Sequence, residues 1–164
     1  MTATRPDAGP PHCVSVLCSV PATRAFAFLS DGDKLGQWAL GCWDARAVGA
    51  GVFRGRSLFD DAVTWVRPVG DATRLEVDFH VGASADRLVP RIRALVVPGP
   101  AIGRDDHCCD VSLLAWRDAG MDDARWLRLV RCHEVEVLLI QARLALEVRD
   151  RHPFTQPDGD PHAS

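Results

Sequence analysis

Residues 122–149, DDARWLRLVRCHEVEVLLIQARLALEVR, give the clearest indication of how this chain folds. At about 100° per residue of an α-helix, one stripe of this segment collects most of its apolar side chains. The stripe consists of Trp126, Val130, Val137, Ile140, Leu144 and Val148. Asp122 is a suitable cap for the first turn. The segment therefore predicts a long amphipathic helix that packs its stripe against the rest of the domain, with His133 inside that stripe.

Seven segments with strand character precede this helix, and turn-forming residues separate them. The expected strands are 13–20, 41–48, 51–58, 62–69, 74–82, 88–97 and 107–116. Two short helices are expected after the first strand. One covers residues 22–29 behind Pro21, and the other runs from a cap at Ser30 or Asp31 to about Trp38. This order predicts an α+β domain in which a curved antiparallel sheet of about seven strands packs on the terminal helix.

The alternation of apolar and charged residues also predicts how the last strands pair. The expected pairs are Val81 with Leu88, Val77 with Ile92, Glu76 with Arg93, Asp110 with Arg93, and Val111 with Ile92. One face then carries Val77, Phe79, Ile92, Cys109, Val111 and Leu113. The other carries a charge ladder of Glu76, Asp78, Arg91, Arg93 and Asp110. These arginines are therefore expected to point outwards, away from any interior site.

The overall composition is that of one ordinary globular domain. The chain has 164 residues, of which 47% are apolar and 25% charged, with a net charge of −3. The chain has no run of basic residues, so we do not expect nucleic acid as a partner. No apolar run approaches the ~20 residues of a membrane span. The first residues lack the hydrophobic segment of a secretion signal, which predicts a cytoplasmic protein. We expect a disordered leader over 1–11, a single domain over 12–149 and a disordered tail over 150–164.

Six cysteines are scattered along the chain without a CxxC pair, and we expect free thiols. A zinc site could be imagined from His107, Cys108, Cys109, Cys132 and His133. Adjacent residues of a strand point to opposite faces, however, so the first three cannot converge on one ion. The sequence also contains no phosphate loop and no dinucleotide fingerprint. It therefore predicts neither a metal nor a cofactor.

Three stretches near the N-terminus carry a resemblance to a known superfamily. They are His12-Cys13-Val14-Ser15-Val16, the segment PATRAFAFLSD over residues 21–31, and Trp38 at the end of the second helix. Together with the order of elements, they resemble the START-related superfamily, also called SRPBCC. Its members include pollen allergens, polyketide cyclases/dehydratases and lipid-transfer domains. The resemblance covers about residues 12–149 and implies a helix-grip fold with a hydrophobic cavity between sheet and helix. Cyclases of this superfamily often place tyrosine around the cavity, and this chain departs from that pattern because it contains no tyrosine.

The candidate site is the part of the helix stripe that would face this cavity. His133 is the first candidate for catalysis, because an imidazole in an apolar pocket can act as acid, base or hydrogen-bond anchor. Glu134 at the margin of the stripe is the second. The expected ligand-binding residues are Trp38, Phe53, Phe59, Trp65, Phe79, His80, Val111, Trp126, Val130, Val137 and Gln141. Strict alternation sends His80 outwards with Asp78, unless a bulge reverses it.

The sequence leaves two main functions open. The protein could be an enzyme that cyclises or dehydrates a polyketide-like or aromatic molecule, with His133 exchanging protons. It could instead be a carrier or sensor of an apolar metabolite or lipid, in which His133 or Gln141 only anchors a polar end. A stress-related interaction protein is a weaker third possibility. The expected partner in every case but the last is a hydrophobic small molecule, bound by a monomer or a homodimer.

Overall fold

The computed structural model describes residues 10–151, so most of the expected leader and tail lies outside the described residues. With η denoting a 3₁₀-helix, the elements are β1 (His12–Cys18), α1 (Ala22–Ser30), η1 (Gly32–Gln37), η2 (Leu40–Cys42), β2 (Trp43–Gly49), β3 (Val52–Arg56), β4 (Val63–Asp71), β5 (Glu76–Gly82), β6 (Val89–Pro98), η3 (Gly99–Ile102), β7 (Cys109–Ala115) and α2 (Asp123–Arg151). The predicted order of elements is confirmed. No helix among the described residues is long and apolar enough to cross a membrane.

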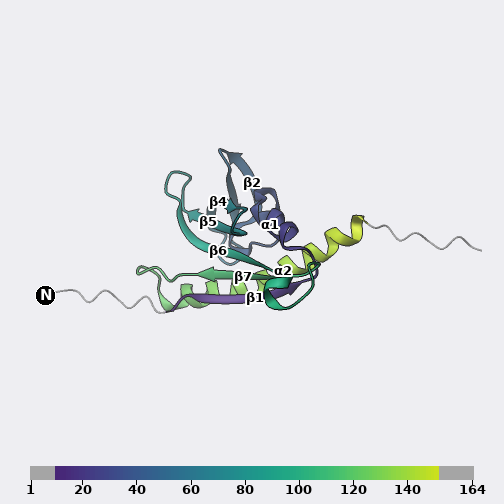
Figure 1. Ribbon diagram of the computed structural model, residues 1–164. Coiled ribbons are helices and arrows are strands. Elements are labelled where there is room, and N and C mark those ends of the chain that lie inside the picture. The colour runs from purple at the N-terminus through teal and green to yellow at the C-terminus, as the bar shows by residue number, and fades with distance from the viewer. Residues whose placement is uncertain (1–9, 152–164) are drawn as a thin grey trace, which may run out of the picture.

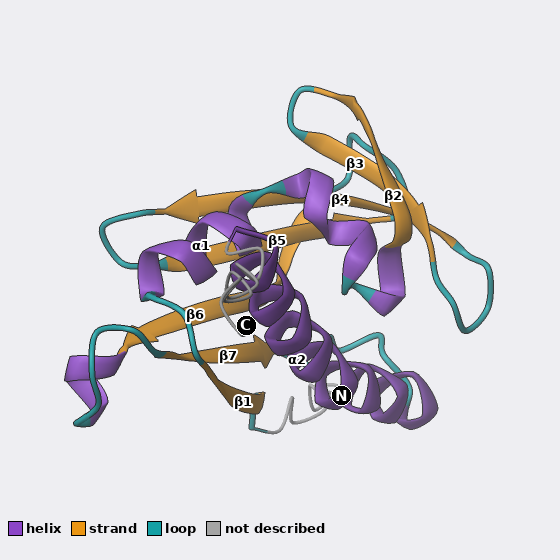
Figure 2. Cartoon of the chain, turned by 90° about the vertical axis from the view of Figure 1, so that its right-hand side faces the viewer, coloured by secondary structure: helices purple, strands orange, loops and turns teal. Residues whose placement is uncertain are grey.

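The seven strands form one antiparallel sheet in the order β1-β7-β6-β5-β4-β3-β2. The sheet curves, and Figure 1 shows β2 to β4 turned well away from the plane of β1 and β7. Both α1 and α2 lie on the same side of the sheet (Figure 2). We call this side the inner face and the opposite side the outer face. The segment formed by α1, η1 and η2 connects β1 at one edge of the sheet to β2 at the other edge. The following strands then return across the sheet, so that β7 pairs with β1.

The core lies between the inner face and the helices. The strands contribute Val66, Val77, Phe79, Ala94, Val96, Cys109, Val111 and Leu113, all of them buried. Helix α2 contributes Val137, Ile140 and Leu144 from the predicted stripe, while Trp126, Val130 and Val148 are half-buried. The carboxylate of Asp122 accepts a hydrogen bond from the Arg125 amide at 2.7 Å and caps the helix as expected.

The second short helix is a 3₁₀-helix, η1, and not an α-helix. The Asp31 side chain caps it by accepting a hydrogen bond from the Asp33 amide at 3.0 Å. The next residue, Gly32, lies under the ring of Phe53, and a Cβ there would come within 1.9 Å of the Phe53 Cε2 atom. Only glycine lets the Phe53 ring approach the helix this closely, so this contact joins η1 to β3.

The predicted registers are wrong, although the predicted faces are right. Ile92 lies opposite Phe79 and not Val77, and β6 pairs with β7 so that Val111 lies opposite Val96. The second error arises because η3 extends the connection: Gly99 donates a hydrogen bond to the Cys108 carbonyl at 2.9 Å and moves the turn towards β7. From Glu76 to Phe79 and between β6 and β7 the shifts are by an even number of residues, and such shifts keep every side chain on its face. Beyond the bulge between Phe79 and His80, Val81 lies opposite Val89, one residue from the predicted Leu88, because the bulge inserts an extra residue.

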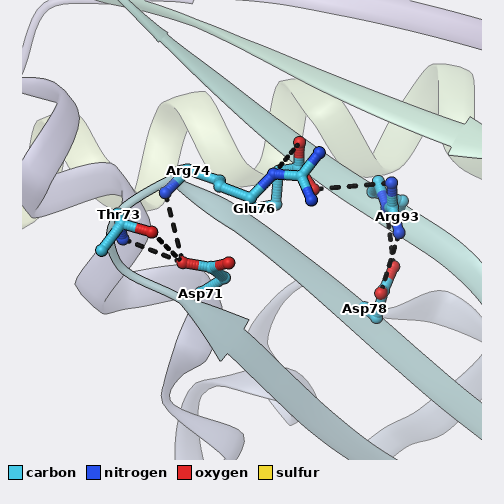
Figure 3. A network of polar contacts seen from close by, with 6 residues as sticks. All are labelled: Asp71, Thr73, Arg74, Glu76, Asp78 and Arg93. Atoms are coloured by element: carbon cyan, nitrogen blue, oxygen red, sulfur yellow. Dashed lines mark hydrogen bonds and ion pairs between the residues drawn. The ribbon is translucent and has the colours of Figure 1, made fainter.

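The charge ladder on the outer face is partly confirmed (Figure 3). Arg93 binds Asp78 through Nε–Oδ1 at 2.7 Å and Nη2–Oδ2 at 3.0 Å, and its Nη1 lies 3.5 Å from Glu76. The hydrogen bond from Arg93 lowers the pKa of Asp78 below its usual value. The predicted pairing of Asp110 with Arg93 is wrong, because Asp110 lies opposite Val97 and accepts a hydrogen bond from the Ser112 hydroxyl, and Arg91 pairs with Asp118. Such surface pairs add little stability.

Candidate functional site

The lead candidate, His133, is buried in the interior as predicted. Its residue is 1% exposed, and its Nδ1 atom is buried without a hydrogen-bond partner among the described residues. The ring lies on α2 at a position where that helix packs on β1, and its centroid is 5.7 Å from that of His12. A buried polar atom without a partner is unusual, because such atoms are nearly always hydrogen-bonded. The Nδ1 atom of His133 is therefore available to a polar group of a ligand.

One helical turn after His133 lies an acid that is buried as well. Glu136 is 5% exposed, and its Oε2 atom is 3.9 Å from the Nε2 atom of His133. This separation is too long for a hydrogen bond. The other carboxylate oxygen, Oε1, accepts a hydrogen bond from the Leu40 amide at 2.7 Å. Glu136 thereby caps the start of η2 and ties this 3₁₀-helix to α2.

Burial moves the pKa values of these two groups in opposite directions. It raises the pKa of Glu136 to about 7, although hydrogen bonds from the Leu40 and Gly41 amides act against this shift. Burial lowers the pKa of His133 to about 4, and the nearby His12 contributes to the same effect. Near neutral pH the imidazole is thus uncharged, while the carboxyl group exists in both protonation states. The pair combines a neutral, weakly basic imidazole with an acid that titrates close to pH 7.

His12 and Trp126 close the end of this cluster. His12 comes from the first residue of β1, and its Nε2 atom is buried without a hydrogen-bond partner among the described residues. The Trp126 ring meets that of His12 edge-to-face, with centroids 6.5 Å apart. Two imidazoles with unpartnered nitrogens therefore lie beside each other, one from the sheet edge and one from the helix.

Aromatic side chains form a second interior group. The Trp38 and Phe79 rings meet edge-to-face with centroids 5.5 Å apart, and both residues are buried. The indole Nε1 of Trp38 has no hydrogen-bond partner among the described residues. A buried indole donor normally finds an acceptor, so this atom is a second point at which an interior ligand could be held.

The structure gathers some of the predicted site residues in the interior and excludes others. Trp38, Phe79, Val111, Val137 and His133 are buried together in the core, with Phe53, Trp126 and Val130 half-buried at its margins. The interior positions expected for Phe59 and Trp65 are wrong. Phe59 is 48% exposed in the loop before β4, and Trp65 lies on the outer face. His80 also faces outwards, opposite Arg67, so the bulge beside it does not turn it inwards.

The two polar helix residues chosen beside His133 have other partners. The Glu134 carboxylate binds Arg131 at 2.8 Å and is half-exposed, so its expected inward position is wrong. The Gln141 amide donates a hydrogen bond to the Leu17 carbonyl at 2.6 Å and so ties α2 to β1. Among residues 10–151, no three acidic, histidine or cysteine side chains converge where they could hold a metal ion.

Sequence reasoning missed Glu136 and His12. Glu136 left one signal, since it interrupts the apolar run from Val135 to Ile140 and lies three residues after His133. His12 left none, because its approach to His133 depends on how β1 packs against α2. The interior chamber implied by the resemblance stays a prediction.

The comparisons with known proteins support the fold. No protein-family model matches the chain, and no curated protein matches it in sequence. Solved structures do match it at a probability of 1.00. The ZhuI aromatase/cyclase from Streptomyces sp. R1128 has a TM-score of 0.61 and 14% identity, over 88% of this chain and 99% of that one. The chain has the START-related helix-grip fold.

Two further structures show the range of proteins with this START-related fold. A START superfamily protein from Mycobacterium smegmatis has a TM-score of 0.60 and 11% identity, over 85% of this chain and 99% of that one. The di-domain ARO/CYC protein BexL has a TM-score of 0.62 and 15% identity. The match covers 85% of this chain but 48% of BexL, so this chain spans about half the length of that protein. Identities this low relate the folds and not the activities.

Proposed function

We propose that this protein binds a hydrophobic or aromatic small molecule between the inner face and α2, with His133 at the polar end of the ligand. The observation that carries the proposal is the unpartnered Nδ1 atom of a histidine that is 1% exposed. Leaving a buried polar group without a partner costs about 1–3 kcal/mol. A ligand hydroxyl or carbonyl near this atom, directly or through water, would remove that penalty.

The chemistry of the cluster favours an enzyme over a simple carrier. General acid–base catalysis works best with groups that titrate near the working pH. Glu136, with its pKa raised to about 7, could give a proton to a departing hydroxyl group, which then leaves as water. Neutral His133 is a weak base with its pKa of about 4, so it could accept a proton only from a carbon that an adjacent carbonyl makes acidic. This division of roles suits the dehydration or cyclisation of a polyketide-like substrate, and two of the similar structures are named as aromatase/cyclase and ARO/CYC proteins.

A non-catalytic carrier or sensor of an apolar metabolite or lipid is the second candidate. It is favoured by the tight engagement of Glu136 with the Leu40 amide, which is a structural role for the acid. It also agrees with the START superfamily protein among the similar structures. In this case His133 would only hold the polar end of the ligand. All six cysteines are free thiols, which supports a reducing compartment such as the cytoplasm for either function.

The His133→Gln variant distinguishes the two candidates once mass spectrometry of the purified protein has identified a copurifying ligand. An enzyme should lose turnover by about 100-fold or more and still bind its ligand, because proton transfer is lost. A carrier should lose only affinity, by about fivefold, which is the effect of one neutral hydrogen bond. Turnover is followed by chromatography and affinity by calorimetry.

The matched control is His107→Gln, since His107 is an exposed histidine far from the interior. It should leave both turnover and affinity unchanged. A His133→Gln variant that binds and converts the identified ligand like the wild type would show that the site is wrongly placed.

A further inference from the structure

An open groove on the outer face lies away from the interior site. Its volume is about 460 Å³, and it is wide open to solvent. It is lined chiefly by Val48 and Val52 of the β2–β3 hairpin, Trp65 and Arg67 of β4, and Ala85 and Asp86 of the loop before β6. Phe53 and Val66 form a cross-strand pair that faces inwards, so the neighbouring pair of Arg54 and Trp65 faces outwards. The groove and His133 are therefore on opposite faces of the sheet.

Two arginines, Arg67 in the lining of the groove and Arg54 beside the Trp65 ring, have no acidic partner among the described residues. Neither Arg54 nor Arg67 forms an ion pair or a side-chain hydrogen bond within residues 10–151. Other arginines of this region do, since Arg46 binds Asp44 and Arg56 binds Asp61. The Nε atom of Arg67 is buried and has no partner among the described residues. The groove therefore offers positive charge, including a guanidinium donor that the protein leaves unused.

The groove also has an apolar floor and an aromatic wall. Val52 is 4% exposed although it belongs to the outward-facing side of β3, because the walls of the groove cover it. The Trp65 ring is half-buried, and the Arg54 guanidinium lies 5.7 Å from its centroid. A flat apolar ring could thus rest on Val52 beside Trp65, within reach of the arginines. Asp86 also lines the groove, and its negative charge repels an anion from that part of the groove.

We propose that this groove binds an aromatic carboxylate, a second ligand distinct from the occupant of the interior. The guanidinium of Arg67 binds the carboxylate, because the planar donors of arginine match the two oxygens of such a group. Arg54 adds positive charge, and the ring of the ligand packs on Val52 and Trp65. The repulsion from Asp86 orients the ligand with its carboxylate towards the arginines.

The probe for this site is 2-naphthoate, with neutral 2-naphthol as the matched ligand. Calorimetric titration should show binding of 2-naphthoate that Arg67→Gln weakens by about 10-fold and Arg54→Gln by about threefold, as expected for losing charged hydrogen-bond donors or a nearby charge. Trp65→Leu should weaken it several-fold. Asp86→Asn should strengthen it by about twofold, because a nearby negative charge is removed. The Arg104→Gln control removes an exposed arginine elsewhere and should change nothing.

Three results would overturn the proposal. The first is the absence of measurable binding of 2-naphthoate to the wild type. The second is equal binding of 2-naphthol and 2-naphthoate, which would exclude the role of the carboxylate. The third is binding that His133→Gln abolishes while folded Arg67→Gln and Arg54→Gln leave it unchanged, which would place the probe in the interior. Circular dichroism establishes that each variant is folded, and Arg54→Gln at an exposed position tests the charge if Arg67→Gln does not fold.

Discussion

The variants Glu136→Gln and His133→Gln should change the pH dependence of stability in opposite directions. The pKa of Glu136 rises from 4.5 in the unfolded chain to about 7 in the folded protein. The folded state therefore binds more protons than the unfolded state between these values, so the free energy of unfolding falls as the pH rises from 4.5 to 7. A shift of this size corresponds to roughly 3 kcal/mol, at about 1.4 kcal/mol for each pKa unit.

His133 acts with the opposite sign. Its pKa falls from 6.5 in the unfolded chain to about 4 in the folded protein. The unfolded state therefore binds more protons, and the free energy of unfolding rises as the pH increases from 4 to 6.5, again by roughly 3 kcal/mol. In the wild type the two effects largely cancel between pH 4.5 and 6.5. The groups that face this pair are His12 and Cys132, and burial raises the pKa of the Cys132 thiol to about 11, outside this window.

Urea denaturation at several pH values between 4 and 7 measures these slopes. The His133→Gln variant retains the Glu136 effect, so it should be more stable at pH 4.5 than at pH 7. The Glu136→Gln variant retains the His133 effect and should be less stable at pH 4 than at pH 6.5. The control is Glu134→Gln, because that carboxylate is half-exposed and bound to Arg131. Identical pH profiles for the two test variants would contradict the burial of the pair.

Leu144→Ala should lower the free energy of unfolding by about 3 kcal/mol, within the range of 2–5 kcal/mol for buried leucines. Leu144 is 0% exposed and packs from the last part of α2 into the core. The loss has two parts. One is the hydrophobic stabilisation that the removed methyl groups provided, and the other is the cost of the cavity that remains because the helix and sheet close around it only partly.

The matched control for this prediction is Leu146→Ala, two residues further along the same helix. Leu146 is 46% exposed, so its truncation should change the free energy of unfolding by less than about 0.5 kcal/mol. Alanine favours the helix at both positions, so propensity does not separate the two variants. Urea denaturation at one pH gives both values, and similar losses for Leu144→Ala and Leu146→Ala would show that α2 does not pack as described.

Local periodicity was sufficient to predict the fold and its two layers. The 3.6-residue pattern of α2 placed His133, Val137, Ile140 and Leu144 in the interior, although it missed the buried Cys132 and Glu136. The two-residue alternation of β5 to β7 assigned the strand side chains to their faces. The wrong registers did not affect this assignment, because they were displaced by two residues from Glu76 to Phe79 and by four between β6 and β7, and the single-residue displacement beyond them is that of a bulge. Faces follow from the chain itself, whereas registers depend on connections such as η3, whose length the sequence pattern does not reveal.

The tertiary structure alone decided which acid joins His133. At 100° per residue, Glu134 and Glu136 lie about 80° to either side of the centre of the stripe, so periodicity does not distinguish them. The structure distinguishes them because η2 covers the side of Glu136, whose carboxylate accepts from the Leu40 amide, while Glu134 stays at the surface. The periodicity of the chain was enough to predict that α2 carries a buried histidine against an antiparallel sheet. Segments distant in the chain, β1 with His12 and η2 with its free amides, determined the chemistry around that histidine, because burial and hydrogen bonding depend on what packs against a residue and not on its neighbours in sequence.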